Sequence, residues 1–243
     1  MNLVIDVGNT LVKFAVFQDN ILLEKLFFEL ELFEKKVQYF FRKYPEIKFS
    51  ILCSVQKQSQ KWKLLLKEKS IFLQLSSSTP VFFENKYSSK STLGIDRLAL
   101  VAAAAYQYKN ENVLIIDAGT CITYDFKNNK NEYLGGIISP GLNMRAKAMH
   151  QFTAKLPLVK LENNDVGILG QDTQQCLEIG VLKATALEID GFITEYKNKF
   201  EDLTVILTGG DSQTLSKNVK NSIFAPSNFL LEGLNQILEF NKS

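Results

Sequence analysis

Histidine and cysteine are scarce in this sequence, and their scarcity excludes several kinds of site. The 243 residues include one histidine and three cysteines. With only His150 available, a Ser-His-Asp triad elsewhere and a metal site of several histidines are both excluded. We expect His150 to lie on a helix without a catalytic role. Cys53, Cys121 and Cys176 are odd in number and far apart, so no disulfide framework or CxxC metal site is visible, and a reducing compartment fits.

An excess of one charge and a long apolar run are also missing. Lys and Arg number 28 and Asp and Glu 26, a formal net charge of +2. This balance argues against a protein that coats nucleic acid or binds a membrane through a basic face. No stretch reaches the roughly 20 apolar residues of a membrane span, and Asp6 interrupts the first apolar run. We expect a cytoplasmic protein with no nucleic-acid or membrane partner.

What is present is an ordinary globular composition, with 46% hydrophobic and 22% charged residues, in a chain long enough for two compact domains. Apolar periodicity and turn residues predict the elements. The expected strands are 2–6, 11–17, 21–28, 49–53, 71–75, 81–83, 122–126, 132–138 and 203–207. The expected helices are 31–43, 57–69, 96–108, 141–153, 174–198 and 228–240, and 84–93 is expected to be a polar loop.

The opening of the chain returns in its middle. Residues 3–10 (LVIDVGNT) and 113–120 (VLIIDAGT) share an apolar run, an Asp, a small residue, a Gly and a nearby Thr. An extended stretch and a turn follow in both places. The repeat predicts two similar α/β domains, 1–110 and 111–243, that close on one ligand from two sides.

The first Asp-Gly element has the residues of a phosphate-binding turn. Gly8 lets the backbone approach a ligand and permits a positive φ, and successive N–H groups in such a turn suit phosphate oxygens. Asn9 and Thr10 add neutral donors, and Lys13 adds a charge that can reach a phosphate. Asp6 can hold Mg²⁺ directly or through water. A hairpin turn that uses Asp and Asn explains the element equally well, and the Walker pattern GxxxxGK[ST] is absent.

Two further elements repeat this chemistry. Gly119 and Thr120 are placed to hold phosphates from the other side, and Asp117 to bind a cation or orient its water. Gly209 and Gly210, with Asp211, follow an apolar strand, where glycines let the backbone lie against an adenine or ribose. A tight turn is the alternative at each place, and the internal repeat weakens it for the middle element.

A fourth element opens the helix predicted at 96–108. Asp96 and Arg97 follow Gly94, at a helix start where exposed N–H groups favour an anion. Arg97 can bind a carboxylate with two parallel hydrogen bonds. On the residues alone, a helix-terminal acid beside a surface arginine is the simpler explanation. Ala102–Ala105 indicate close helix packing.

Three spaced Asp/Gly elements are typical of the actin-like ATPase and sugar-kinase superfamily, and within it the sequence resembles the type III pantothenate kinases. The motifs that carry the resemblance are DVGNT at 6–10 with Lys13, GIDRLA at 94–99, IDAGT at 116–120, GGIISPGL at 135–142, TAKLP at 153–157 and LTGGD at 207–211. They follow the family's order across most of the chain. The implied fold is two actin-like (ribonuclease H-like) α/β domains, each a mixed β-sheet with flanking helices.

The resemblance implies ATP-dependent phosphorylation of pantothenate to 4'-phosphopantothenate, the first step toward coenzyme A, by a homodimer. It implies ATP with Mg²⁺ and a monovalent cation, K⁺ or NH₄⁺, held by Asp117. Asp96 would be the catalytic base. ATP would bind at Asp6, Val7, Gly8, Asn9, Thr10, Leu11, Val12, Lys13 and Thr120. Pantothenate would bind at Tyr87, Gly94, Ile95, Asp96, Arg97 and Thr173.

Two alternatives remain at this point. Another carboxylate or sugar kinase of the same fold would share the phosphate-binding turns, although Arg97 favours a substrate with a carboxylate. A non-catalytic regulator that binds ATP or a metabolite would need none of the three acids, and Asp6, Asp96 and Asp117 are all present.

Overall fold

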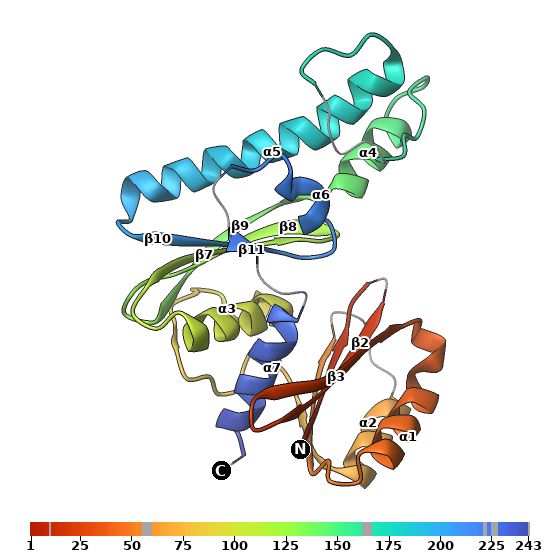
Figure 1. Cartoon of the computed structure of the whole chain (residues 1–243), viewed down its shortest axis with the longest axis vertical. Helices are drawn as coiled ribbons and strands as arrows, with labels where there is room; N and C mark the ends of the chain where they lie inside the picture. Colours follow the sequence, from red (N-terminus) through yellow and green to blue (C-terminus); the bar gives the residue numbers. More distant parts are fainter. Residues whose placement is uncertain (10, 55–59, 162–166, 221–222, 225–227, 243) are drawn as a thin grey trace. The chain divides into compact units, whose positions relative to one another are not determined.

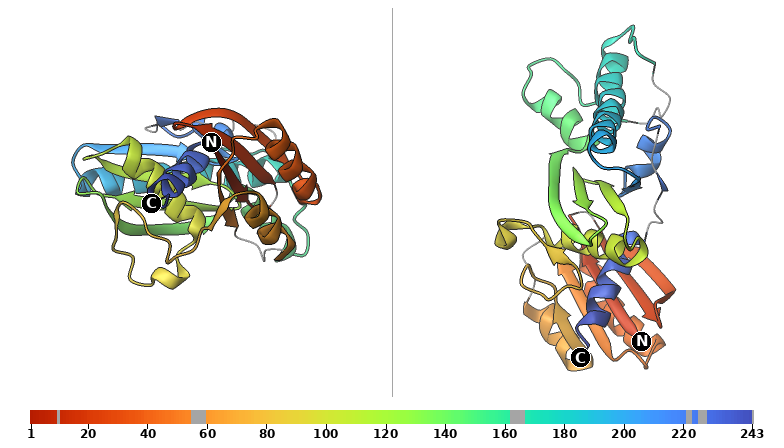
Figure 2. Two further views of the ribbon diagram at one scale, coloured as in Figure 1. Left: turned by 90° about the horizontal axis from the view of Figure 1, so that it is seen from below. Right: turned by 90° about the vertical axis from the view of Figure 1, so that its left-hand side faces the viewer.

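The computed structural model describes residues 1–9, 11–54, 60–161, 167–220, 223–224 and 228–242 (Figure 1, Figure 2). The chain divides into two compact units, Met1–Gln107 with Asn228–Ser243, and Tyr108–Ser227. Each unit consists of a mixed β-sheet with flanking helices, as predicted. Within the described residues, no helix is long and apolar enough to cross a membrane.

The first unit has a five-stranded sheet in the order β3-β2-β1-β4-β5. The strands are β1 (Asn2–Val7), β2 (Val12–Gln18), β3 (Ile21–Phe28), β4 (Phe49–Ser54) and β5 (Ile71–Gln74). The first three form an antiparallel meander, whereas β4 pairs in parallel with β1 and β5 with β4. A short η1 turn (Leu30–Leu32), α1 (Phe33–Lys43) and α2 (Gln60–Lys69) complete this part.

The central strand β1 is buried along its whole length. Because side chains alternate across a strand, its residues divide between two faces. Leu3, Ile5 and Val7 join the apolar core that includes residues of α1 and α2. Asn2, on the other face, donates to Asn235 of α7 (Phe229–Phe240) at 2.7 Å. Asp6 shares this second face, so the alternation directs its carboxylate away from the apolar core.

Helix α3 (Ile95–Gln107) packs against α7 within the first unit. A Cβ on Gly233 would lie 1.9 Å from the carbonyl oxygen of Ala99, so the backbones of the two helices touch there. Ala102–Ala105 are buried, which confirms the expectation of close helix packing. The packing partner is a helix of the same chain.

The second unit repeats the strand order of the first. Its strands run β11-β10-β7-β8-β9, with β7 (Asn112–Ala118), β8 (Cys121–Lys127) and β9 (Glu132–Pro140) antiparallel, and β10 (Leu203–Thr208) and β11 (Ile223–Phe224) parallel to β7. The helices are α4 (Leu142–Gln151), α5 (Thr173–Lys199) and α6 (Ser212–Ser216). Helix α5 lies across one face of this sheet (Figure 1) and buries Val181, Ile189 and Ile193 against it.

The structure differs from the sequence prediction in three places. The strand predicted at 81–83 is wrong, because these residues form no strand and the Phe82 ring packs 5.9 Å from that of Phe240. A two-residue strand, β6 (Glu84–Asn85), and a short η2 turn (Lys90–Thr92) lie in the segment predicted as a loop. The proposed domain 111–243 included the final helix, whereas α7 packs on α3, β1 and β4 and belongs to the first unit.

Candidate active site

The turn between β1 and β2 carries the first Asp-Gly element. Val7 and Val12 form the last strand pair, and the Gly8 N–H donates to the carbonyl of Leu11 at 3.2 Å. The side chains of Val7 and Val12 lie in the core, so only their backbone is available to a nucleotide. Asn9 and Leu11 are exposed. Gly8 does not adopt the positive φ that its sequence position permitted, and Thr10 lies outside the described residues.

An open hollow of about 460 Å³ borders this turn. It is lined by Gly8, Asn9, Leu11 and Val12 on one side and by Glu29–Glu31 on the other. The turn is therefore accessible from solvent within its own unit, as a phosphate-binding turn requires.

Asp6 and Lys13 form a partly buried ion pair beside the turn. The Asp6 carboxylate and the Lys13 ammonium lie 3.0 Å apart, and the side chains are 6% and 34% exposed, respectively. Burial raises the pKa of Asp6 above its ordinary value, Lys13 opposes the rise, and the charge of Asp96 adds to it. The structure thus brings Asp6, Lys13 and Asp96 into one electrostatic group, with the ammonium open to solvent.

Asp96 lies in the first turn of α3, as predicted. Its Oδ1 accepts from the Arg97 backbone N–H at 2.9 Å. A Cβ on Gly94 would lie 2.5 Å from that same oxygen, so the glycine makes room for the carboxylate. Ile95 and Asp96 are both partly exposed. A ligand can therefore reach the Asp96 carboxylate.

Arg97 is not the surface residue that the simpler explanation assumed. It is only 4% exposed, and its guanidinium lies 5.6 Å from the centre of the Tyr87 ring. A guanidinium over an aromatic face is held in one orientation. This contact brings Tyr87 and Arg97 together, and Asp96 precedes Arg97 in the first turn of α3.

Cys53 is a neighbour of this group that sequence reasoning missed. It is fully buried on β4, directly opposite Asp6 in the parallel register of β1 and β4. Burial raises the pKa of its thiol well above the ordinary value, and the charges of Asp6 and Asp96 add to the effect. The thiol is therefore neutral beside Asp6. Only the strand register identifies it.

The second unit carries a matching group at the end of β7. The Gly119 N–H donates to the carbonyl of Cys121 at 3.0 Å and closes the turn that exposes Thr120. Gly209 has a φ of +96°, and a Cβ there would lie 2.5 Å from Oδ1 of Asp117. The partly buried Asp117 carboxylate thus lies against the backbone after β10. Burial also raises the pKa of Asp211.

Two further residues of the sequence prediction, Thr173 and His150, lie on helices of the second unit. Thr173 is the exposed first residue of α5, after its N-cap Asp172, and it belongs to the second unit. The pantothenate positions Tyr87 and Gly94–Arg97 belong to the first. His150 lies on α4, as expected, and its Nδ1 is 2.8 Å from the carbonyl oxygen of Leu156.

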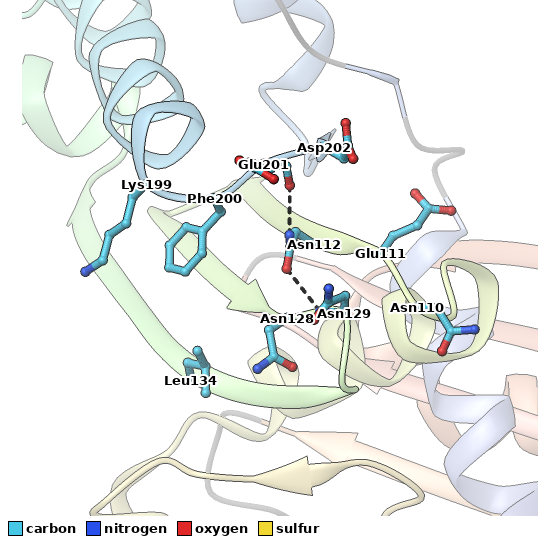
Figure 3. Close-up of a pocket in the computed structure, with 10 residues that line it drawn as sticks. All are labelled: Asn110, Glu111, Asn112, Asn128, Asn129, Leu134, Lys199, Phe200, Glu201 and Asp202. Atoms are coloured by element: carbon cyan, nitrogen blue, oxygen red, sulfur yellow. Dashed lines mark hydrogen bonds between the residues drawn. The ribbon is translucent and has the colours of Figure 1, made fainter.

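A larger hollow at the other end of β7, about 610 Å³, is lined by turn residues (Figure 3). The asparagine side chains that line it form hydrogen bonds within the surrounding loops. Asn112 donates to the carbonyl of Glu201 at 2.8 Å and accepts from the Asn129 N–H at 3.0 Å. The Asn128 side chain accepts from the backbone of Lys130 and Glu132. We assign this hollow to loop structure.

Comparisons with known proteins identify the family of the chain. A family model described as type III pantothenate kinase matches residues 2–195. The chain is 52% identical over 243 residues to the type III pantothenate kinase of Christiangramia forsetii, with 100% of both chains covered. It is 44% identical over 241 residues to that of Flavobacterium johnsoniae, covering 99% of this chain and 98% of the relative.

Solved structures show the same fold at low identity. A Baf family protein from Campylobacter jejuni has a TM-score of 0.63 at 23% identity over 98% of each chain. A ROK hexokinase from Thermus thermophilus has a TM-score of 0.54 at 11% identity over 99% of each chain. The predicted actin-like fold class is confirmed. From the family match and these identities, this chain belongs to the type III pantothenate kinase family.

Proposed function

We propose that this protein transfers the γ-phosphoryl group of ATP to the primary hydroxyl of pantothenate, in the cytoplasm, as the first step of coenzyme A synthesis. Membership of the family supports this proposal. The single observation that supports it within the structure is that Asp96, next to the buried Arg97, lies near enough for its charge to act on Asp6, which pairs with Lys13. Asp96 then serves as the proton acceptor, Arg97 as the cation that binds the substrate carboxylate, and Lys13 as the cation that binds phosphate.

Phosphoryl transfer depends on positioning and on neutralised charge more than on covalent chemistry. The exposed ammonium of Lys13 binds phosphate oxygens, and the backbone of 8–12 and Thr120 hold the nucleotide. Asp96 accepts the proton of the pantothenate hydroxyl as that oxygen attacks phosphorus. Arg97, oriented by Tyr87, binds the pantothenate carboxylate. Gly94, Ile95 and Thr173 are the remaining substrate contacts proposed from the family resemblance.

A magnesium ion fits the residues present when it is held mainly by phosphates and water. Asp6 offers one carboxylate, already paired with Lys13 at 3.0 Å, and no group of three or more His, Cys, Asp or Glu that could hold a metal occurs among the described residues. Mg²⁺ commonly binds through one or two carboxylates together with substrate phosphates. Bound there, it would neutralise phosphate charge.

A coupled ADP-release assay tests the proposed function. Pantothenate should support ADP formation, whereas a panel of sugars should not. ADP release with a sugar and none with pantothenate would support another kinase of the same fold. ATP binding without turnover of any acceptor would support a regulator.

A monovalent cation is proposed at Asp117. Its carboxylate lies against the backbone at Gly209, and a carboxylate with neighbouring carbonyls is a suitable oxygen site. Activity should be higher in K⁺ or NH₄⁺ than in Na⁺, because a bound cation balances the charge of substrate carboxylate and phosphate. Initial rates in matched salts measure this. The Asp117→Asn variant should lose the difference, and equal wild-type rates in Na⁺ and K⁺ would refute the site.

A homodimer is proposed from the second unit and the family resemblance. Large apolar side chains near α4 and α5 are strongly exposed, with Phe152 and Ile168 at 87% and Leu169 at 80%. Exposed apolar clusters commonly mark interfaces. Sedimentation at micromolar concentration should give twice the 27.5 kDa chain mass. Phe152→Asp should shift the protein toward a monomer, and a wild-type protein that sediments only as a monomer would disprove the dimer.

A further inference from the structure

The end of β9 lies against the proposed nucleotide turn. The Gly141 N–H donates to the carbonyl of Thr120 at 3.2 Å. A Cβ on Gly141 would lie 2.3 Å from the carbonyl oxygen of Gly119 and 2.5 Å from that of Thr120. Real Cβ atoms do not approach so closely, so the two backbone segments touch directly. Any shift of Pro140 and Gly141 therefore moves the Gly119–Thr120 turn.

Arg145 of α4 fixes the position of that segment. Its Nε donates to the carbonyl of Pro140 at 2.8 Å, and an NH₂ group of the same guanidinium bonds to Oε2 of Glu188 at 2.6 Å. The planar guanidinium makes both bonds at once, in a geometry that lysine cannot reproduce. Pro140 is thus attached, through Arg145, to Glu188 of α5.

Glu188 uses both of its carboxylate oxygens. Oε1 accepts from the Ser139 hydroxyl at 2.6 Å and from the Tyr124 hydroxyl at 3.1 Å, while Oε2 receives Arg145. Burial acts to raise the pKa of Glu188, but the hydrogen bonds from Ser139 and Arg145 outweigh it and the pKa is lowered. One ionised side chain therefore joins β8, β9, α4 and α5.

We propose that Glu188 and Arg145 are positioning residues for the Gly119–Thr120 turn, and hence for the phosphates of the nucleotide. The inference rests on the proposed function, which gives Thr120 a nucleotide contact. Neither side chain is assigned a contact with substrate. They act through Pro140 and Gly141, and a surface ion pair would have no such connection to the turn.

Direct binding of ATP with Mg²⁺, measured by calorimetry, tests the proposal without catalysis. Arg145→Ala and Glu188→Ala should each raise the Kd for ATP by roughly 10- to 100-fold, the scale of a small misplacement of a positioning group. The KM for pantothenate should change less than twofold. Glu195→Ala, an exposed acid on the same helix, is the matched control and should bind ATP as the wild type does.

A double-mutant cycle separates positioning from general loss of structure. If the two residues act as a unit, Arg145→Ala with Glu188→Ala should weaken ATP binding no more than either change alone. Glu188→Gln, which keeps the size of the side chain, should fall between wild type and Glu188→Ala. If the alanine variant fails to fold, Glu188→Gln carries the same test.

The outcomes are distinguishable. A wild-type protein that does not bind ATP overturns the proposed function. A wild-type protein that binds ATP, with variants that bind it equally well, overturns the positioning role and leaves the function standing. If the Kd for ATP and the KM for pantothenate rise equally in the variants, together with a fall in Tm, the two residues have a structural role only. That result would also overturn the proposal.

Discussion

Replacing Asp96 by asparagine is expected to lower kcat by roughly 10²–10⁴-fold, the usual range for a general base. The lower end is favoured because a loose transition state needs little help from a base. Asparagine keeps the size of the side chain and can still accept from the Arg97 N–H, the bond seen at 2.9 Å, so helix α3 should still form. Pantothenate binding should change much less than kcat.

The Arg97→Ala variant, measured in parallel, should be impaired in pantothenate binding more than in kcat. The buried guanidinium next to Tyr87 would bind the substrate carboxylate in ground state and transition state alike, so the KM for pantothenate should rise. Arg97→Lys is the matched control: it keeps the charge, loses the planar fork, and should recover only part of the affinity. A pantothenate analogue without the carboxylate should discriminate poorly between wild type and Arg97→Ala. Variants that lose Tm but keep their kinetics would make the pair structural.

Asp6→Asn is expected to lower kcat by roughly 10²-fold or more, the scale seen when one preorganised electrostatic group is removed. The carboxylate orients the Lys13 ammonium at 3.0 Å, and an uncharged amide binds an ammonium or a metal ion more weakly because it has no negative charge. Steady-state kinetics at saturating Mg²⁺ measure the loss. Asp19→Asn is the matched control, since it makes the same chemical change at an exposed turn of the same unit. Near-normal turnover by Asp6→Asn would remove Asp6 from the mechanism.

The fold should survive the Asp6 change. The pKa of Asp6 is raised in the folded protein, chiefly by burial. A carboxyl whose folded pKa is raised contributes stability below its unfolded pKa and loses that contribution as pH rises through the folded pKa. Ionisation of Asp6 in the folded protein therefore costs stability, a cost that a neutral amide does not carry. Thermal unfolding of Asp6→Asn at pH 7 should give a Tm no lower than that of the wild type.

Much of the site could be predicted because it is local in sequence. The turn at Gly8, the turn at Gly119 and the helix start at Asp96 are each short segments whose residue types follow from turn and helix-end chemistry. The repeat of LVIDVGNT as VLIIDAGT also predicted the matching β-meanders, β1–β3 and β7–β9.

What could not be predicted depends on packing between distant segments. The sequence does not show that Arg97 is buried, because its burial depends on the segments that pack around it. Nor does it show that Cys53 lies opposite Asp6, which depends on the register of β1 and β4. Glu188 and Arg145 meet because α4 packs against α5. The sequence prediction assigned the final helix to the second domain because it follows that domain along the chain. In the structure, Gly233 of this helix packs against Ala99 of the first unit.

The return of α7 to the first unit has a consequence for biosynthesis. The ribosome makes Tyr108–Ser227, the whole second unit, before it makes the helix that covers Ala99 and Ala102–Ala105 of α3. The second unit can fold while it emerges, but the first unit must wait with an apolar helix face uncovered. The nascent chain should therefore be most exposed to aggregation, and most dependent on chaperones, just before Phe229–Phe240 leaves the exit tunnel.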